Sequence, residues 1–355
     1  MEEKSKGYQN IKINKLPNSE VEIEGEIPAE VIQKCRANAI KGLSEKVNLP
    51  GFRKGHIPEN VLVKNVGEME IMQEAAEEAL NNEYGNILME NQIKAIGKPE
   101  ISITKLAPGN PMSFKIKTSV LPEFSLPDHK KIAKEEISKE SDKIEVTEKE
   151  IENLILELRN TVAHQGHQHK EGEAHDHKIE EKDLPEFNDE FVKKLGDFKD
   201  VADFKEKVKA NMQKEKEMGA KDKKRVSLME NLIKNTKIEL PEVIINSELD
   251  KLVAQFKDDL ARAGMGYEDY LKNIKKTEED MKKEWRDTAE KKGKVQLILS
   301  KIAKEENLHP TEEEIKKEID LIMGHNKDAD RFRVRMYVET FLTNEKVLRF
   351  LESQK

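Results

Sequence analysis

Residues 49–58 read LPGFRKGHIP, and helical patterns flank this stretch on both sides. After it, Pro58 can begin a short helix that ends near Gly67. Before it, apolar residues recur at every fourth position, as on one face of a helix: Val31, Cys35, Ala39, Leu43 and Val47. A proline and two glycines interrupt the helical pattern between them. The stretch therefore predicts a helix–loop–helix hairpin that carries Phe-Arg-Lys at its tip.

Alternating segments surround this hairpin. Four segments alternate between apolar and polar residues, as half-buried strands do: 8–16, 20–27, 98–106 and 112–121. The second pair encloses APGNP, a strong turn signal, and residues 68–91 read as a longer helix. We therefore predict an α+β domain over residues 1–121, consisting of a small antiparallel sheet with a projecting helical hairpin.

The rest of the chain reads as mostly helical. Residues 122–146 contain two prolines and mixed charge, and we interpret them as a linker. A helix over 147–163 begins with Thr147 and Glu150, which fit a capping box. A His-rich loop over 164–182 follows, and helices with thin apolar stripes fill 183–355. Such stripes can pair helices but cannot build one thick core.

Composition limits the class of protein. The 355 residues are 38% charged and 36% hydrophobic, the mean hydropathy is −0.79, and the formal net charge is −8. The length predicts two or three domains, and the single Cys35 excludes an internal disulfide. No apolar run approaches the roughly 20 residues of a membrane span, and no signal peptide is visible at the start. We expect a cytoplasmic protein that has no membrane partner.

Motifs of catalysis are missing from the sequence. We find no Ser-His-Asp context, no Gly-rich phosphate loop and no HExxH pattern, so we expect no cofactor. Five histidines are weak candidates for metal ligands: His164, His167, His169, His175 and His177. Their spacing matches no closed metal site, and a solvated linker is the favoured interpretation.

The stretch from Gly51 to Pro58 resembles the ribosome-docking signature of trigger factor, the bacterial nascent-chain chaperone. The resemblance continues in AEEALNNEYGNILMENQIKAIGKPEI, in DLPEFNDEFVKKLGDFKDVADFKEKVKANM and in IELPEVIINSELDKLVAQF, and so covers nearly the whole chain in order. It implies a ribosome-binding domain over 1–121. It also implies a two-armed helical chaperone domain formed by 147–163 and 183–355.

The resemblance further implies the partners of this protein. Docking on the large ribosomal subunit near the exit tunnel, through protein with rRNA as a further contact, is assigned to six residues: Gly51, Phe52, Arg53, Lys54, Gly55 and Pro58. Nascent and unfolded polypeptides are the expected clients, held without ATP. Self-association as a homodimer away from the ribosome is also implied.

The loop residues suit such docking chemically. Arg53 can make bidentate contacts and Lys54 can act as a point charge, while Phe52 can fill a pocket on a partner. Nearby cations outweigh Glu45: Lys34, Arg36, Lys41, Lys46, Arg53 and Lys54. The alternative is that Phe52 packs against its own helices and the cations are merely solvated. We assign no role to His56 or Ile57.

One departure from the family is informative. Family members usually carry an FKBP-like prolyl isomerase domain of about 100 residues, which would lie between the helix at 147–162 and EEKDLPEF. About 20 residues occupy that position here, too few for a five-stranded sheet. We therefore expect a holdase that lacks the isomerase domain. The alternatives are a prolyl isomerase, as the family label suggests, or a ribosome-independent holdase of the extracytoplasmic cradle type.

Overall fold

The computed structural model describes residues 7–139, 145–166 and 184–354. They form two compact units, each assembled from segments that are distant in the sequence. The first unit comprises the residues up to Leu126 together with Thr236–Lys301. The second comprises Pro127–Asn235 and the residues from Ile302 onward.

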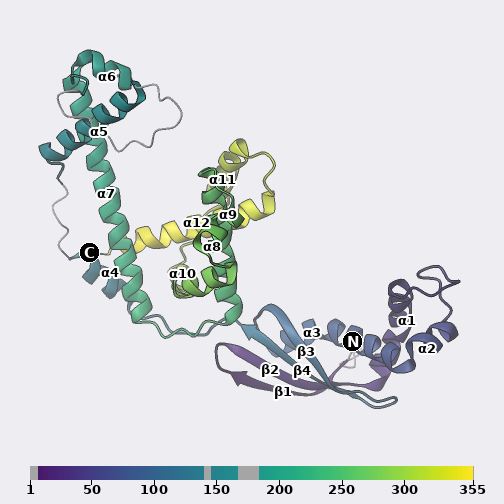
Figure 1. Ribbon diagram of the computed structural model, residues 1–355. Helices are drawn as coiled ribbons and strands as arrows, with labels where there is room; N and C mark the ends of the chain where they lie inside the picture. The colour runs from purple at the N-terminus through teal and green to yellow at the C-terminus, as the bar shows by residue number, and fades with distance from the viewer. Residues whose placement is uncertain (1–6, 140–144, 167–183, 355) are drawn as a thin grey trace. The chain divides into compact units, whose positions relative to one another are not determined.

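The first unit contains a four-stranded antiparallel sheet with the strand order β1-β2-β4-β3 (Figure 1). The strands are β1 (Gln9–Leu16), β2 (Glu20–Ile27), β3 (Ala95–Lys105) and β4 (Met112–Val120). The predicted antiparallel sheet is confirmed. The two sequence hairpins, β1-β2 and β3-β4, join through the central pair β2 and β4, so β1 and β3 are the two edges.

The two faces of the sheet differ in chemistry because side chains alternate along each strand. The inner face packs Ile23 and Ile116 directly opposite each other, both fully buried. Gly25 is required on this face, because a Cβ there would lie 2.7 Å from the ring of Phe114. On the outer face Lys115 pairs with Glu22 and Glu24 at 3.1 and 2.9 Å.

Three helices complete the α+β part of the first unit: α1 (Ala29–Lys46), α2 (Glu59–Val66) and α3 (Glu68–Glu90). Alanines at 75, 76 and 79 let α3 approach the inner face of the sheet closely. The far end of the hairpin has its own small core of Leu43, Ile57, Leu62 and Ile71. The predicted hairpin therefore projects from the sheet with apolar support of its own.

Residues 236–301 add three helices to the first unit, namely α8 (Glu242–Arg262), α9 (Tyr267–Ile274) and most of α10 (Glu278–Glu305). Trp285 packs edge-on against Phe256 with ring centroids 5.3 Å apart, so it anchors α10 to α8. Helix α9 was not predicted from the sequence. It has only eight residues, and the two glycines before it indicated only a break.

In the described residues of the second unit, the regular elements are helices: α4 (His129–Ile137), α5 (Glu148–Gly166), α6 (Asp189–Leu195), α7 (Val201–Lys234), α11 (Glu312–His325) and α12 (Arg331–Glu352). Thr147 and Glu150 form the expected capping box at the start of α5. Phe191 of α6 and Phe204 of α7 lie in one apolar cluster with Ile151 and Ile155 of α5.

The segment 122–146, which we interpreted as a linker, contains the helix α4. Its residues Ala133 and Glu136 are buried, and Glu136 bonds to Ser227 and Asn231 of α7. A nine-residue helix with one buried carboxylate has too short an apolar pattern to be recognised in sequence. It is held by α7, which lies about 90 positions further along the chain, and by Phe350 of α12, whose ring lies beside His129.

Candidate binding surfaces

The loop between α1 and α2 consists of two tight turns. The amide of Phe52 donates to the carbonyl of Leu49 at 3.2 Å, and the amide of His56 donates to that of Arg53 at 3.0 Å. Gly51 and Gly55 occupy the third position of each turn with φ of 88° and 78°. A positive φ at that position is what a type II turn requires, and glycine adopts it without strain. The two glycines are therefore needed for the path of the loop.

A buried serine fixes the base of the loop. The carbonyl of Ser44 accepts from the amide of Gly55 at 2.9 Å, and its hydroxyl accepts from the amide of Ile57 at 3.2 Å. The side chain of Ile57 is buried in the small core of the hairpin. Pro58 follows as an exposed residue, and its carbonyl accepts from the amides of Val61 and Leu62 in the first turn of α2. Sequence reasoning gave Ile57 no role and missed Ser44, because only the folded hairpin brings them together.

The loop presents its three central side chains to solvent. Phe52 is 40% exposed, and Arg53 and Lys54 are exposed. Within the described part of the chain, no hydrogen bond or ion pair engages the side chain of Arg53 or of Lys54. Phe52 lies outside the apolar core of the hairpin. The side chains at the tip are therefore open to solvent, and their role in docking stays a prediction.

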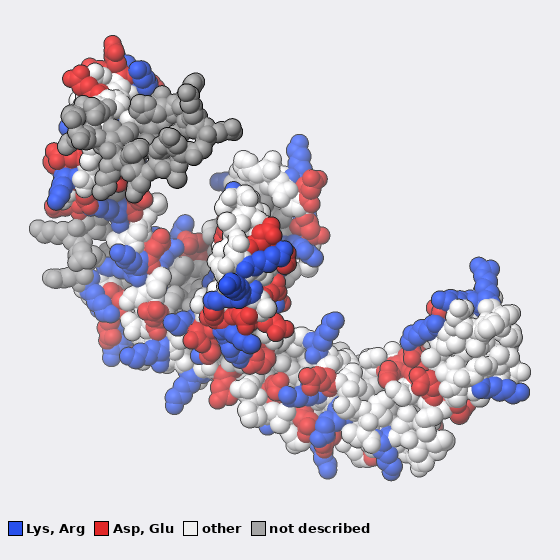
Figure 2. Space-filling view, viewed as in Figure 1, with Lys and Arg blue, Asp and Glu red and all other residues white. Residues whose placement is uncertain are grey.

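The hairpin is less basic than a count along the sequence suggested. Arg36 bonds to Glu68 at 2.7 Å and to Glu59 at 3.0 Å, and Lys46 bonds to Glu74 at 2.6 Å. The hydrogen bond that Lys46 donates to Glu74 raises the pKa of Lys46. These acidic residues come from α2 and α3, which fold back onto α1. Among the described residues, Lys34 and Lys41 on α1 and Arg53 and Lys54 at the tip keep no ion-pair partner. Figure 2 shows basic side chains beside an uncharged area at this end of the unit.

A second surface lies on α12, where four large apolar side chains are exposed: Phe332, Met336, Tyr337 and Phe341. Phe332 is 71% exposed. The rings of Tyr337 and Phe341 stack with centroids 6.2 Å apart. Phe332 also lines a groove of about 600 Å³ with Ile319, and charged side chains of α11 and α12 surround them. We call these four residues the α12 surface.

Methionines elsewhere in the helices differ in exposure and do not mark this surface. Met229 and Met281 are buried, whereas Met218 and Met265 are exposed. The aromatic residues of α12 were detectable as the run RFRVRMYVETF, in which large apolar side chains lie between arginines. The signal was missed because exposure depends on which face of α12 packs against α11. That face carries Val334, Val338 and Leu342.

The predicted histidine tract is placed only in part. His164 lies in α5, and the other four candidates, His167, His169, His175 and His177, lie outside the described residues. In the ranges that the structure describes, no three His, Cys, Asp or Glu side chains gather closely enough to hold a metal ion. No helix of those ranges is long and apolar enough to cross a membrane.

An exposed loop on an α+β unit and exposed aromatics on long polar helices define a class of protein that works by binding other macromolecules. Two family models match the chain in order. One is described as "Bacterial trigger factor protein (TF)" and covers residues 9–158; the other is described as its C-terminus and covers residues 200–352. The chain belongs to the trigger factor family of chaperones.

Relatives and a solved structure agree with this assignment. A trigger factor of Caldicellulosiruptor bescii is 26% identical, over 92% of this chain and 90% of the relative. A trigger factor of Clostridium botulinum is 24% identical, over 98% of this chain and 99% of the relative. A solved structure, reported as "Promiscuous Substrate Recognition in Folding and Assembly Activities of the Trigger Factor Chaperone", has the same fold. Its TM-score is 0.55 and its identity 20%, over 98% of this chain and all of that one.

The comparisons also confirm the departure from the family. The two family matches leave only residues 159–199 between them, and the prolyl isomerase domain is absent there. The alignment with the C. bescii relative spans 403 positions, although this chain has only 355 residues. That difference is expected where relatives contain residues that this chain lacks.

Proposed function

We propose that this chaperone docks on the large ribosomal subunit near the exit tunnel through Gly51–Gly55 and Pro58, and shields nascent or unfolded polypeptides without ATP. Docking at the ribosome implies action in the cytoplasm. The observation that carries the proposal is the tip of the hairpin, where Phe52, Arg53 and Lys54 are exposed on a rigidly tied loop.

The loop has the properties of a docking element for an anionic partner. Its two cations have no anionic partner among the described residues, so binding would not first require an intramolecular ion pair to break. Two turns and the buried Ser44 hold the backbone, which lowers the entropy cost of ordering the loop on binding. Phe52 adds an apolar anchor between the turns.

The α12 surface suits the holding of unfolded chains. Its exposed rings and Met336 can contact apolar client side chains, and methionine adapts to many shapes. Arginines and glutamates around it keep the surface wetted. Contacts of this kind are individually weak and unspecific, as promiscuous binding requires.

Two triple variants that remove similar side chains test the proposal, because each should impair one of the two functions and leave the other intact. Replacing Phe52, Arg53 and Lys54 by Ala should abolish co-sedimentation with ribosomes and leave suppression of aggregation intact. Replacing Arg331, Phe332 and Arg333 by Ala removes the same kinds of side chain from α12. That variant should still bind ribosomes but suppress the aggregation of a denatured client less well.

Salt provides an independent check, because exposed charge contacts are screened. Ribosome binding by the unmodified chain should weaken as ionic strength rises. Co-sedimentation of the 52–54 variant at the level of the unmodified chain would refute docking through the loop. Absence of ribosome binding by the unmodified chain would favour the ribosome-independent holdase.

A further inference from the structure

The open edge of the sheet in the first unit lies beside a groove. Strand β3 is an outer strand and pairs only with β4. Over residues 98–105, no other described segment makes a backbone hydrogen bond to its outer side. An edge strand of this kind presents amides and carbonyls that can pair with another chain.

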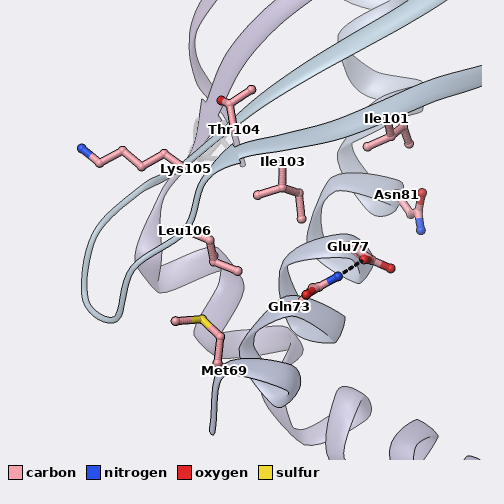
Figure 3. Close-up of a pocket in the computed structure, with 9 residues that line it drawn as sticks. All are labelled: Met69, Gln73, Glu77, Asn81, Ile101, Ile103, Thr104, Lys105 and Leu106. Atoms are coloured by element: carbon pink, nitrogen blue, oxygen red, sulfur yellow. Dashed lines mark hydrogen bonds between the residues drawn. The ribbon is translucent and has the colours of Figure 1, made fainter. Parts of the chain in front are cut away.

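The groove has a volume of about 560 Å³ and runs between β3 and α3 (Figure 3). Its helical wall consists of residues four positions apart on α3, which share one face: Met69, Gln73, Glu77 and Asn81. From the strand side, Ile101 and Ile103 point toward the helix, and Leu106 continues the apolar floor (Figure 3).

The floor of this groove is incompletely covered. Ile101 is 37% exposed and Met69 is 55% exposed, whereas Ile116 on the neighbouring strand is fully buried. The helix α3 contributes its buried alanines to the core under β2 and β4. Apolar surface is therefore left uncovered beside unpaired backbone groups, and an extended polypeptide can satisfy both.

The helical wall of the groove carries one carboxylate, Glu77. Glu77 accepts a hydrogen bond from the amide of Gln73 at 3.1 Å. Lys46 attracts Glu77 only at longer range, because it bonds directly to Glu74, and no ion pair engages Glu77 within the described ranges. Lys105 points away from the helix at the rim (Figure 3). A lysine or arginine of an occupant would complement Glu77, with its aliphatic stem on the apolar floor.

We propose that this groove binds an extended polypeptide segment as a fifth strand on β3. Main-chain hydrogen bonds to the open edge would supply affinity, and alternate side chains would enter the groove. The preferred segment carries apolar residues at alternate positions and one Lys or Arg facing Glu77. This site goes beyond the proposed function, because neither the docking loop nor the α12 surface takes part in it.

The first test measures side-chain recognition with the full-length chain. The probe is a fluorescent, amidated eight-residue peptide with Val at alternate positions, one of them replaced by Lys, and Thr between them. Fluorescence anisotropy should show that Glu77→Lys weakens its binding about five-fold. A peptide with Glu in place of Lys should show the opposite preference. The control Glu152→Lys makes the same charge change at an exposed position of α5 and should have no effect.

The second test measures main-chain pairing with the unmodified protein, so it does not depend on the folding of any variant. Two versions of the peptide carry N-methyl groups on alternate amides. One version is methylated at the odd-numbered residues and the other at the even-numbered residues. Only one set can face β3, so one peptide should lose at least about ten-fold in affinity, as expected for several lost hydrogen bonds. The other peptide should bind as before.

Three outcomes would overturn the proposal. Equal binding of the two methylated peptides would show unspecific adsorption instead of strand addition. Insensitivity to Glu77→Lys would remove the assigned charge contact. Loss of peptide binding in the 331–333 variant would move the site to α12, and the proposed holdase surface would survive that result. Peptide binding that is retained by both triple variants supports a separate site.

Discussion

Glu136 offers the sharpest test of how the second unit is held together. This carboxylate on α4 is only 5% exposed. It accepts hydrogen bonds from Asn231 at 2.5 Å, from Ser227, and from Lys139 at 2.5 Å. Burial opposes its ionisation, but the bonds from Lys139 and Ser227 outweigh burial and lower the pKa of Glu136. The charged form therefore connects α4 to α7.

The magnitude of its loss can be worked out from these contacts. Glu136→Ala leaves the hydroxyl of Ser227 and the amide of Asn231 without their partner, at about 1–3 kcal/mol for each buried group. Lys139 is largely exposed, so its contribution is small. We expect a loss of about 3–4 kcal/mol in the free energy of unfolding. Glu136→Gln keeps the shape and one acceptor, and should cost about 1–2 kcal/mol.

Urea unfolding can separate the two units. Far-ultraviolet circular dichroism follows both units, whereas the single Trp285 lies in the first. Glu136→Ala should lower the midpoint of the helical transition, and the midpoint of Trp285 fluorescence should stay within error. A free energy of unfolding within about 0.5 kcal/mol of the unmodified chain, the range of neutral surface changes, would refute the role of Glu136 in fastening α4.

Further predictions concern the loop, acid stability and catalysis. Gly55→Ala places a Cβ at a φ of 78° and 3.4 Å from Glu45; we expect about 1 kcal/mol of local strain and weaker ribosome co-sedimentation. Hydrogen bonds from Lys346 and Thr311 lower the pKa of Glu314 to about 2. Their stabilisation of α11 should be complete above the ordinary glutamate pKa and disappear as pH falls to about 2. Circular dichroism of the unmodified chain and of Glu314→Gln, measured as the pH falls, checks this. The helix contents of the two proteins should become equal only in acid. Prolyl exchange in a short peptide should stay at the uncatalysed tens to hundreds of seconds, and a rate that rises with chaperone concentration would contradict this expectation. ATP should leave aggregation suppression unchanged, which light scattering with and without nucleotide would show.

The local backbone of the docking loop could be predicted from sequence, because its causes are local. Glycine at the third position of a turn permits positive φ, and Pro58 ends the loop and begins α2. The anchoring of the loop could not be predicted in this way. Ser44 and Ile57 are 13 positions apart, and nothing in either residue type indicates a hydrogen bond between them. The partners of Arg36 on α2 and α3 were hidden for the same reason.

The sequence by itself determined the strands, most helices, their capping residues and the absence of an isomerase domain. The strands, helices and caps follow from periodicity and turn chemistry, which are properties of neighbouring residues. The absence of the isomerase domain follows from the family resemblance together with the short segment at that position. Tertiary structure decided which surfaces remain open. Strand β3 becomes an edge only because β2 pairs with β4, and α4 is held in place by α7 and α12. The aromatic rings of α12 are exposed because α11 covers another face of that helix. Exposure depends on contacts between distant segments, and binding surfaces are what those contacts leave uncovered.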